Sequence, residues 1–92
     1  MIRRFRHKGL ERWFRQGDLR RINAKFGPHL QRMLDMIDQA TAVEQLDIPG
    51  MNLHSLKGER KGMSAMIVYG NWRLTFRFDG EDAMDLNLED YH

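Results

Sequence analysis

The sequence contains no cysteine and only two prolines among its 92 residues. The absence of cysteine excludes disulfide bonds and thiolate chemistry, and it suits a reducing cytoplasm. No apolar run approaches the length of a membrane span. The arginine-rich start lacks the apolar segment and cleavage site of a secretion signal. We therefore expect a soluble, cytoplasmic protein that makes no membrane contact.

Recognisable cofactor motifs are also missing from the chain. The four histidines show no spacing typical of metal ligands, and no glycine pattern of a phosphate-binding loop or a dinucleotide site occurs. We therefore expect chemistry without a metal or a cofactor. A chain of this length forms one modest core, so we expect a single domain over residues 1–92 with a shallow surface site.

The net charge of +2 conceals a strong segregation of charge along the chain. Residues 1–32 contain ten bases and two acids, and residues 51–77 contain five bases and one acid. The intervening residues 33–50 and the final residues 78–92 contain acids and no base. A surface that gathers the two basic segments would attract a polyanion such as RNA, although small soluble domains carry solvated charge in any case.

Helical periodicity dominates the first half of the chain. The apolar spacing over His7–Gln16 predicts a first helix that ends at Gly17, and Pro28 is well placed in the first turn of a second helix. This second helix extends to about Gln39 because one apolar stripe repeats at i, i+3, i+4 and i+7, namely Leu30, Met33, Leu34 and Ile37. Residues 41–44 have a capping-box pattern that predicts one further turn, and residues 1–5 are compatible with a short strand.

The second half has the alternation of β-strands. Residues 63–69 and 72–78 predict two strands joined by a Gly70-Asn71 turn, and Asp79-Gly80 predicts a second hairpin turn. The final strand is expected to turn Met84, Leu86 and Leu88 toward the core. The sequence thus predicts an α+β fold, with an antiparallel sheet packed against two or three N-terminal helices and one sheet face exposed.

Polar groups suited to catalysis converge at one end of this predicted sheet. Arg73 alternates with the apolar residues of its strand, and antiparallel pairing places it beside the terminal residues Glu89, Asp90, Tyr91 and His92. A guanidinium there can bind a phosphate, and the terminal groups can transfer or steer protons. The alternatives are a salt bridge from Arg73 to Glu89 or Asp90, and a terminus that is merely polar.

A second polar cluster lies in the basic segment over residues 53–62. It contains His54, Lys57, Arg60 and Lys61, with glycines at positions 58 and 62. Loops of this composition commonly contact phosphates, and an imidazole can accept or donate a proton near neutral pH. In isolation, a hydrogen-bonded structural histidine is the favoured interpretation of His54.

Taken together, four segments resemble the HigB toxins of the RelE/ParE superfamily. They are Phe5-Arg6-His7-Lys8-Gly9-Leu10, residues 53–62, Asn71-Trp72-Arg73-Leu74-Thr75-Phe76, and Asp90-Tyr91-His92. The resemblance covers the whole chain and implies a curved antiparallel sheet carrying a ribosome-dependent endoribonuclease site. Such toxins cut messenger RNA in the A site of the 70S ribosome, where 16S rRNA surrounds them. They are neutralised by a helix-turn-helix antitoxin of HigA type. We expect a monomer when free and a heterotetramer with the antitoxin.

The resemblance also implies roles for individual residues. The catalytic cluster it indicates is His54, Arg73, Asp90, Tyr91 and His92, and the substrate contacts are Lys57, Asn71, Arg60 and Lys61. Met63 and Ser64 depart from the aromatic residues that many relatives have after the second glycine, which leaves base stacking and codon preference open.

The implied reaction needs no metal, because a 2′-hydroxyl can attack its own phosphorus when proton donors, proton acceptors and a cation surround it. We expect Arg73 to bind the phosphate and His54 and His92 to share the proton transfers, in an order the sequence does not fix. Asp90 would orient an imidazole, and Tyr91 would position a group or donate a proton. Two alternatives are a ParE-like toxin that inhibits DNA gyrase and a basic RNA-binding module without chemistry.

Overall fold

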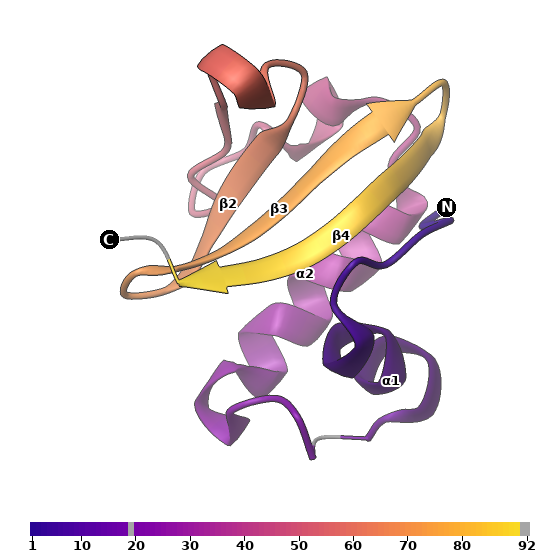
Figure 1. Ribbon diagram of the computed structural model, residues 1–92, viewed down its shortest axis with the longest axis vertical. Coiled ribbons are helices and arrows are strands. Elements are labelled where there is room, and N and C mark those ends of the chain that lie inside the picture. The colour runs from indigo at the N-terminus through magenta and orange to yellow at the C-terminus, as the bar shows by residue number, and fades with distance from the viewer. Residues whose placement is uncertain (19, 91–92) are drawn as a thin grey trace.

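The computed structural model describes residues 1–18 and 20–90 (Figure 1). Within them, helices α1 (Lys8–Gln16) and α2 (Gly27–Gln39) precede the strands β1 (His54–Ser55), β2 (Ser64–Tyr69), β3 (Trp72–Asp79) and β4 (Asp82–Asp90). Short 3-10 turns are η1 (Ala24–Phe26), η2 (Val43–Leu46) and η3 (Gly58–Arg60). The strands form one antiparallel sheet in the order β1-β2-β3-β4, and it curves in front of α2 (Figure 1). The predicted α+β fold is confirmed.

Helix α1 begins and ends as the sequence predicts. The side chain of His7 caps the helix by accepting a hydrogen bond from the Leu10 backbone nitrogen at 2.9 Å. Gly17 ends the helix in the left-handed conformation at φ 70°. Gly9 is an unfavourable residue inside a helix, but Arg21 approaches the helix closely at this position. A Cβ on residue 9 would lie 2.6 Å from Cβ of Arg21, so a larger residue would not fit.

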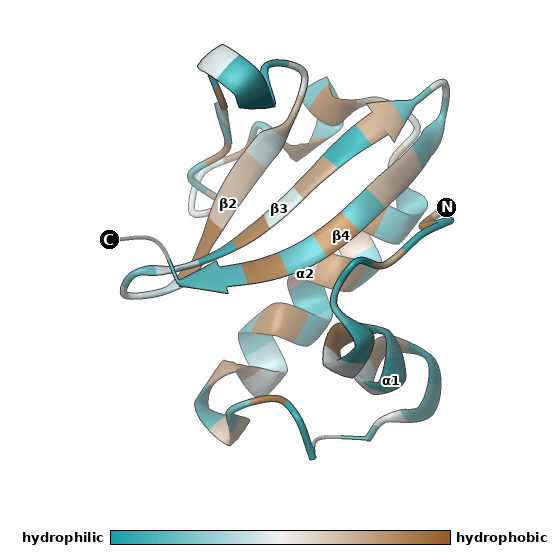
Figure 2. Ribbon diagram, viewed as in Figure 1, coloured by the Kyte–Doolittle hydropathy of each residue, from teal (hydrophilic) through white to brown (hydrophobic). Residues whose placement is uncertain are grey.

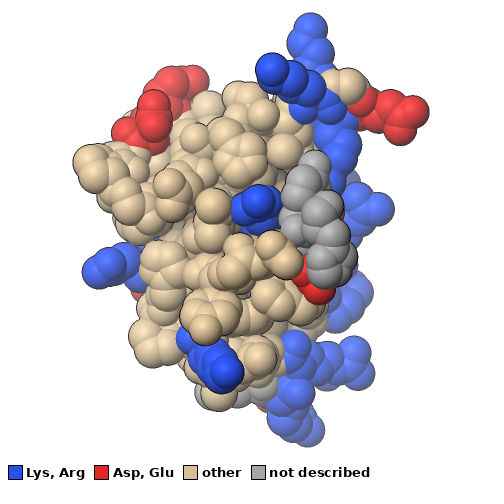
Figure 3. All heavy atoms as spheres, turned by 90° about the vertical axis from the view of Figure 1, so that its left-hand side faces the viewer, with Lys and Arg blue, Asp and Glu red and all other residues tan. Residues whose placement is uncertain are grey.

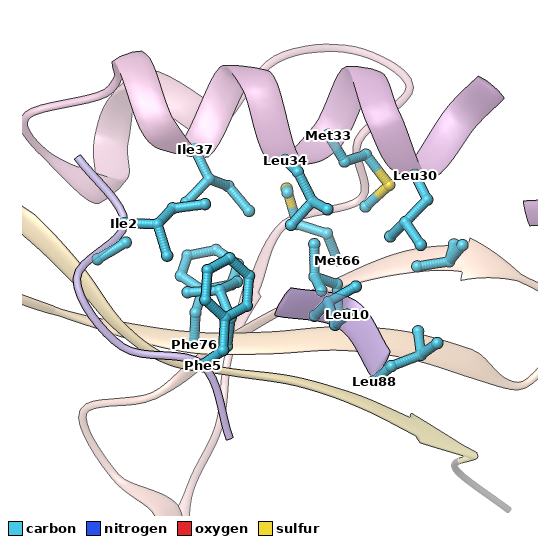
Figure 4. Packing of buried hydrophobic residues seen from close by; sticks show 14 of the residues in the cluster. Ile2, Phe5, Leu10, Leu30, Met33, Leu34, Ile37, Met66, Phe76 and Leu88 are labelled. Carbon is cyan, nitrogen blue, oxygen red and sulfur yellow. The ribbon is translucent and has the colours of Figure 1, made fainter. Parts of the chain in front are cut away.

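Helix α2 supplies one wall of the core. The predicted stripe of Leu30, Met33, Leu34 and Ile37 is completely buried. It packs toward side chains of the sheet that include Met66 and Phe76 (Figure 4). Apolar and polar residues alternate along β3 and β4, as expected for a sheet with one face in the core (Figure 2). No helix in the described parts of the chain is long and apolar enough to cross a membrane.

The N-terminal residues lie along the outer edge of β4 (Figure 1). They form two isolated parallel bridges, Ile2 to Ala83 and Phe5 to Leu86, and no continuous strand. The Ile2 nitrogen also donates to Asp38 of α2 at 2.9 Å. This segment therefore covers the edge of the sheet and connects it to the helical layer.

A bulge in β4 overturns one detail of the predicted strand. Thr75 pairs with Asn87, but Arg77 pairs with Met84, so β4 contains one extra residue at this point. Asp85 lies there with φ 57°. The bulge shifts the alternation, and Ala83 is completely buried while Met84 is only half-buried. The expectation that Met84 faces the core together with Leu86 and Leu88 is therefore wrong at Met84.

The capping box predicted over residues 41–44 also differs in detail. The expected turn is present as η2, but its N-cap is Ala42, which provides no side-chain hydrogen bond. Thr41 instead exchanges two hydrogen bonds with the side chain of Gln45, at 2.9 and 3.1 Å. Both predicted hairpin turns are confirmed, with Gly70 and Gly80 at positive φ.

Candidate active site

The outward face of the sheet, which points away from α2, carries one residue from each of the two predicted clusters, His54 and Arg73. Strand register places His54 opposite Ala65, Ala65 opposite Thr75, and Thr75 opposite Asn87. The next row toward the end of β4 contains Ile67, Arg73 and Glu89. Residues opposite each other in adjacent strands point to the same side, so the side chains of His54 and Arg73 share this face. Strand spacing separates their Cα atoms by about 12 Å.

His54 presents an imidazole that is held in place from one side. Its side chain is exposed, and Nδ1 lies 3.1 Å from the carbonyl oxygen of Asn52. Because a carbonyl oxygen can only accept, this contact places the proton on Nδ1 and leaves Nε2 of the neutral ring as an acceptor. Asn52 has φ 52°, a conformation that asparagine tolerates better than most residues. His54 is thus both hydrogen-bonded and accessible.

Arg73 occupies the predicted position beside the end of β4. Its register partner is Glu89, and the preceding residue Trp72 pairs with Asp90. Arg73 is therefore close to the end of the chain as far as Asp90, but the pairing of Asp90 with Trp72 places Asp90 on the opposite face of the sheet from Arg73. The Arg73 side chain is partly buried, with Nε and Nη1 of its guanidinium inaccessible to solvent, and it lies outside the hydrophobic cluster of the core.

Glu89 forms the best-defined polar network of the outward face. Its two carboxylate oxygens accept from Arg60, Oε1 from Nη1 at 3.0 Å and Oε2 from Nη2 at 2.5 Å. The hydroxyl of Thr75 also donates to Oε2 at 2.5 Å. These bonds, above all those from Arg60, hold the pKa of Glu89 below its ordinary value. Thr75 is completely buried, so the centre of this sheet face is covered rather than exposed as the alternation predicts.

Within the basic loop, Arg60 is held by an ion pair to the sheet. The sequence suggests a substrate contact, whereas the structure pairs Arg60 with the carboxylate of Glu89 on β4. Strand alternation does place Glu89 on the same face as Arg73, which is the signal that could have indicated a local ion pair. It does not indicate which basic residue reaches Glu89, because that depends on the path of the loop.

Asp90 lies at the edge of a hollow of about 270 Å³. The hollow is on the Trp72 side of the sheet, and its walls include Asn71 of the β2–β3 turn, Tyr69 and Lys25. Trp72 and Tyr69 both pack against Phe26, with ring centroids 5.7 and 6.0 Å from it. The structure thus brings the predicted residues Asn71 and Asp90 together. Tyr91 and His92 lie outside the described residues.

The remaining predicted contacts belong to the exposed basic loop. Lys57 precedes η3 and Lys61 follows it, and both side chains are exposed. Glycines with positive φ, Gly58 and Gly62, allow the loop to reverse tightly between β1 and β2. Lys and Arg side chains gather along the right-hand edge of Figure 3, the side that faces the viewer in Figure 1 and includes both the outward face of the sheet and α1. Such a surface attracts polyanions.

A second, larger hollow lies elsewhere. It measures about 580 Å³ between α2 and η2, and none of the predicted site residues lines it. Across residues 1–18 and 20–90, no group of three or more histidine, cysteine or acidic side chains is arranged to hold a metal ion.

Comparison with known proteins places this chain in a defined family. The family model of the RelE-like toxin HigB of type II toxin-antitoxin systems matches residues 3–92. The chain therefore belongs to the HigB-like family of RelE-like toxins, and the resemblance seen in its motifs is confirmed. Among individual relatives, Endoribonuclease HigB of Proteus vulgaris is 41% identical over 92 residues, which is 100% of both chains.

Proposed function

We propose that this toxin is an endoribonuclease that cuts messenger RNA in the ribosomal A site. The observation that carries the proposal is the identity of 41% with Endoribonuclease HigB over the full length of both chains. The placement of His54 and Arg73 on one sheet face supports it, because cleavage requires proton transfer and charge stabilisation at the same phosphate.

In this mechanism, His54 takes the proton from the attacking 2′-hydroxyl. The contact between Nδ1 and the Asn52 carbonyl favours the tautomer whose Nε2 accepts a proton. His92 then donates a proton to the departing 5′-oxygen, Asp90 orients an imidazole, and Tyr91 positions the reacting groups or donates a proton. The products are a 2′,3′-cyclic phosphate and a 5′-hydroxyl.

Charge stabilisation is assigned to Arg73 and the basic loop. The guanidinium of Arg73 binds the scissile phosphate and stabilises the negative charge that grows on it during displacement. Lys57 and Lys61 are exposed on the loop that follows β1, where they can contact neighbouring phosphates, and Asn71 contacts the substrate from the β2–β3 turn.

The small size of the domain supports dependence on the ribosome. A free message has no fixed conformation, whereas a codon in the A site is held in place, so the ribosome supplies the orientation that a small site cannot. The basic segments of the chain would bind 16S rRNA. We place the toxin in the cytoplasm, as a monomer when free and in a heterotetramer with a helix-turn-helix antitoxin of HigA type.

Mapping of message ends after induction of the toxin without its antitoxin tests this proposal. Growth should stop and translated messages should be fragmented, while the same messages lacking a start codon should remain intact. Unchanged cleavage without the start codon would contradict ribosome dependence. Intact messages combined with inhibited DNA gyrase would favour the ParE-like alternative.

A further inference from the structure

The ion pair between Arg60 and Glu89 joins two parts of the site that are far apart in sequence. Arg60 is at the end of η3 in the basic loop, and Glu89 is on β4, 29 residues further along the chain. Both partners are partly buried, with 34% of the Arg60 side chain and 22% of the Glu89 side chain exposed. Two parallel bonds to one carboxylate fix the orientation of both side chains more strongly than a single contact would.

The position of Glu89 makes its charge important for RNA binding. Glu89 is the direct cross-strand partner of Arg73, the residue assigned to the phosphate. An uncompensated carboxylate there would repel the phosphate and compete with it for the guanidinium of Arg73. Both carboxylate oxygens accept from Arg60, and the buried hydroxyl of Thr75 adds a third bond.

We propose that Arg60 is a positioning residue that neutralises Glu89 beside Arg73, rather than a direct contact to RNA. This inference rests on the proposed nuclease function. Arg60 allows Arg73 to bind a phosphate because it neutralises the carboxylate beside it. The ion pair also anchors the loop that carries Lys57 and Lys61 to the end of β4.

Single-turnover cleavage on programmed ribosomes by four variants tests the inference. Arg60→Gln leaves Glu89 uncompensated, so its cleavage rate should fall at least tenfold. Glu89→Gln removes the charge but keeps an oxygen that accepts from Thr75, so its rate should stay within about threefold of wild type. The cleavage rate of the double variant Arg60→Gln/Glu89→Gln should recover to within about threefold of the rate of Glu89→Gln. Arg60→Lys keeps the positive charge, so its cleavage rate should be higher than that of Arg60→Gln.

A matched control comes from the other end of the same strand. Arg77 donates to Asp85 at 2.9 Å, with exposed fractions of 37% and 27% that resemble those of the first pair. Arg77→Gln should therefore change the cleavage rate by less than about threefold. Thermal unfolding of each variant separates a loss of fold from a loss of function, and the double variant keeps the test valid because it lacks the uncompensated charge.

The salt dependence of ribosome binding provides a second readout. If Arg60 contacts a phosphate, Arg60→Gln should lower the slope of log affinity against log salt by about 0.7, and the double variant should be as impaired as the single one. Either result would overturn the inference. Absence of cleavage by wild type would instead contradict the proposed function itself, so the two failures are distinguishable.

Discussion

The two ends of β4 each carry a carboxylate bonded to arginine, yet these carboxylates serve different parts of the molecule. Near the start of the strand, Asp85 accepts from Arg77 at 2.9 Å and lies 3.8 Å from Arg4 of the N-terminal segment. Near its end, Glu89 accepts from Arg60 on the outward face. The first carboxylate stabilises a bulge and the chain beside it, whereas the second lies beside the residue proposed to bind RNA. Similar ion pairs can therefore support the fold at one end and the site at the other.

The largest expected effect distinguishes Arg73 from Arg77, which lie on the same strand near these two ends. Arg73→Ala should lower the single-turnover cleavage rate by on the order of 10²–10³, because it removes the group that stabilises charge on the phosphate. Its melting temperature should remain close to that of wild type, since Arg73 is not part of the core. Arg77→Ala should cleave within about threefold of wild type. Equal losses in the two variants would contradict the assignment.

The two termini provide a second comparison. Deletion of His92 should nearly eliminate cleavage, because the proposed proton donor is lost, while a terminal residue ordinarily contributes little to stability. A tag after His92 should also impair cleavage, and a tag before Met1 should be tolerated better. Cleavage and ribosome binding are measured separately for the deletion, the tagged proteins and His92→Gln. Cleavage near the wild-type rate after deletion would remove His92 from the mechanism.

The apolar side of β3 allows a prediction about stability alone. Phe76 is completely buried, so Phe76→Ala should lower the free energy of unfolding by about 3–5 kcal/mol. Trp72 is only half-buried beside the hollow that contains Asp90, in contrast to the fully buried aromatic that the alternation suggests. Trp72→Ala should therefore cost less, about 1–2 kcal/mol. The free energy of unfolding of both variants is measured by denaturant titration. Equal losses in Phe76→Ala and Trp72→Ala would contradict the difference in burial between the two side chains.

The smallest expected effect concerns the cap of α1. His7 accepts from Leu10 through Nδ1, and burial lowers the pKa of His7 from its ordinary value of 6.5. The unfolded chain therefore binds a proton first as the pH falls, so stability should decrease below about pH 6.5 until the folded protein is also protonated. His7→Asn should retain the cap without this titration, and His7→Ala should cost about 1 kcal/mol. Parallel pH-stability curves for wild type and His7→Asn would contradict this account.

Regular periodicity explains which features could be predicted from the sequence. The stripe from Leu30 to Ile37 and the alternation from Trp72 to Phe78 identify the core, and two hairpin turns determine which strands pair. These signals are local, because each depends on residues a few positions apart. The antiparallel pairing that follows from the second turn is sufficient to predict that Arg73 lies beside Glu89.

Features that depend on long-range contacts could not be predicted in the same way. The bulge at Asp85 is accompanied by contacts to Arg77 and to Arg4 at the start of the chain. Because of the bulge, Ala83 is buried in the core in place of Met84. The partner of Arg60 depends on how the loop over residues 56–63 folds back toward β4. Neither arrangement leaves a periodic pattern in the sequence.

The most direct test of the central claim is single-turnover cleavage of a message that carries a 2′-deoxynucleotide at the scissile position of the A-site codon. If the residues of the outward face promote attack by the 2′-hydroxyl, wild-type toxin should cut the all-ribose message and leave 2′,3′-cyclic phosphate and 5′-hydroxyl ends. It should fail to cut the substituted message, although it binds the programmed ribosome equally well. Cleavage of the 2′-deoxy message at a comparable rate would contradict the account.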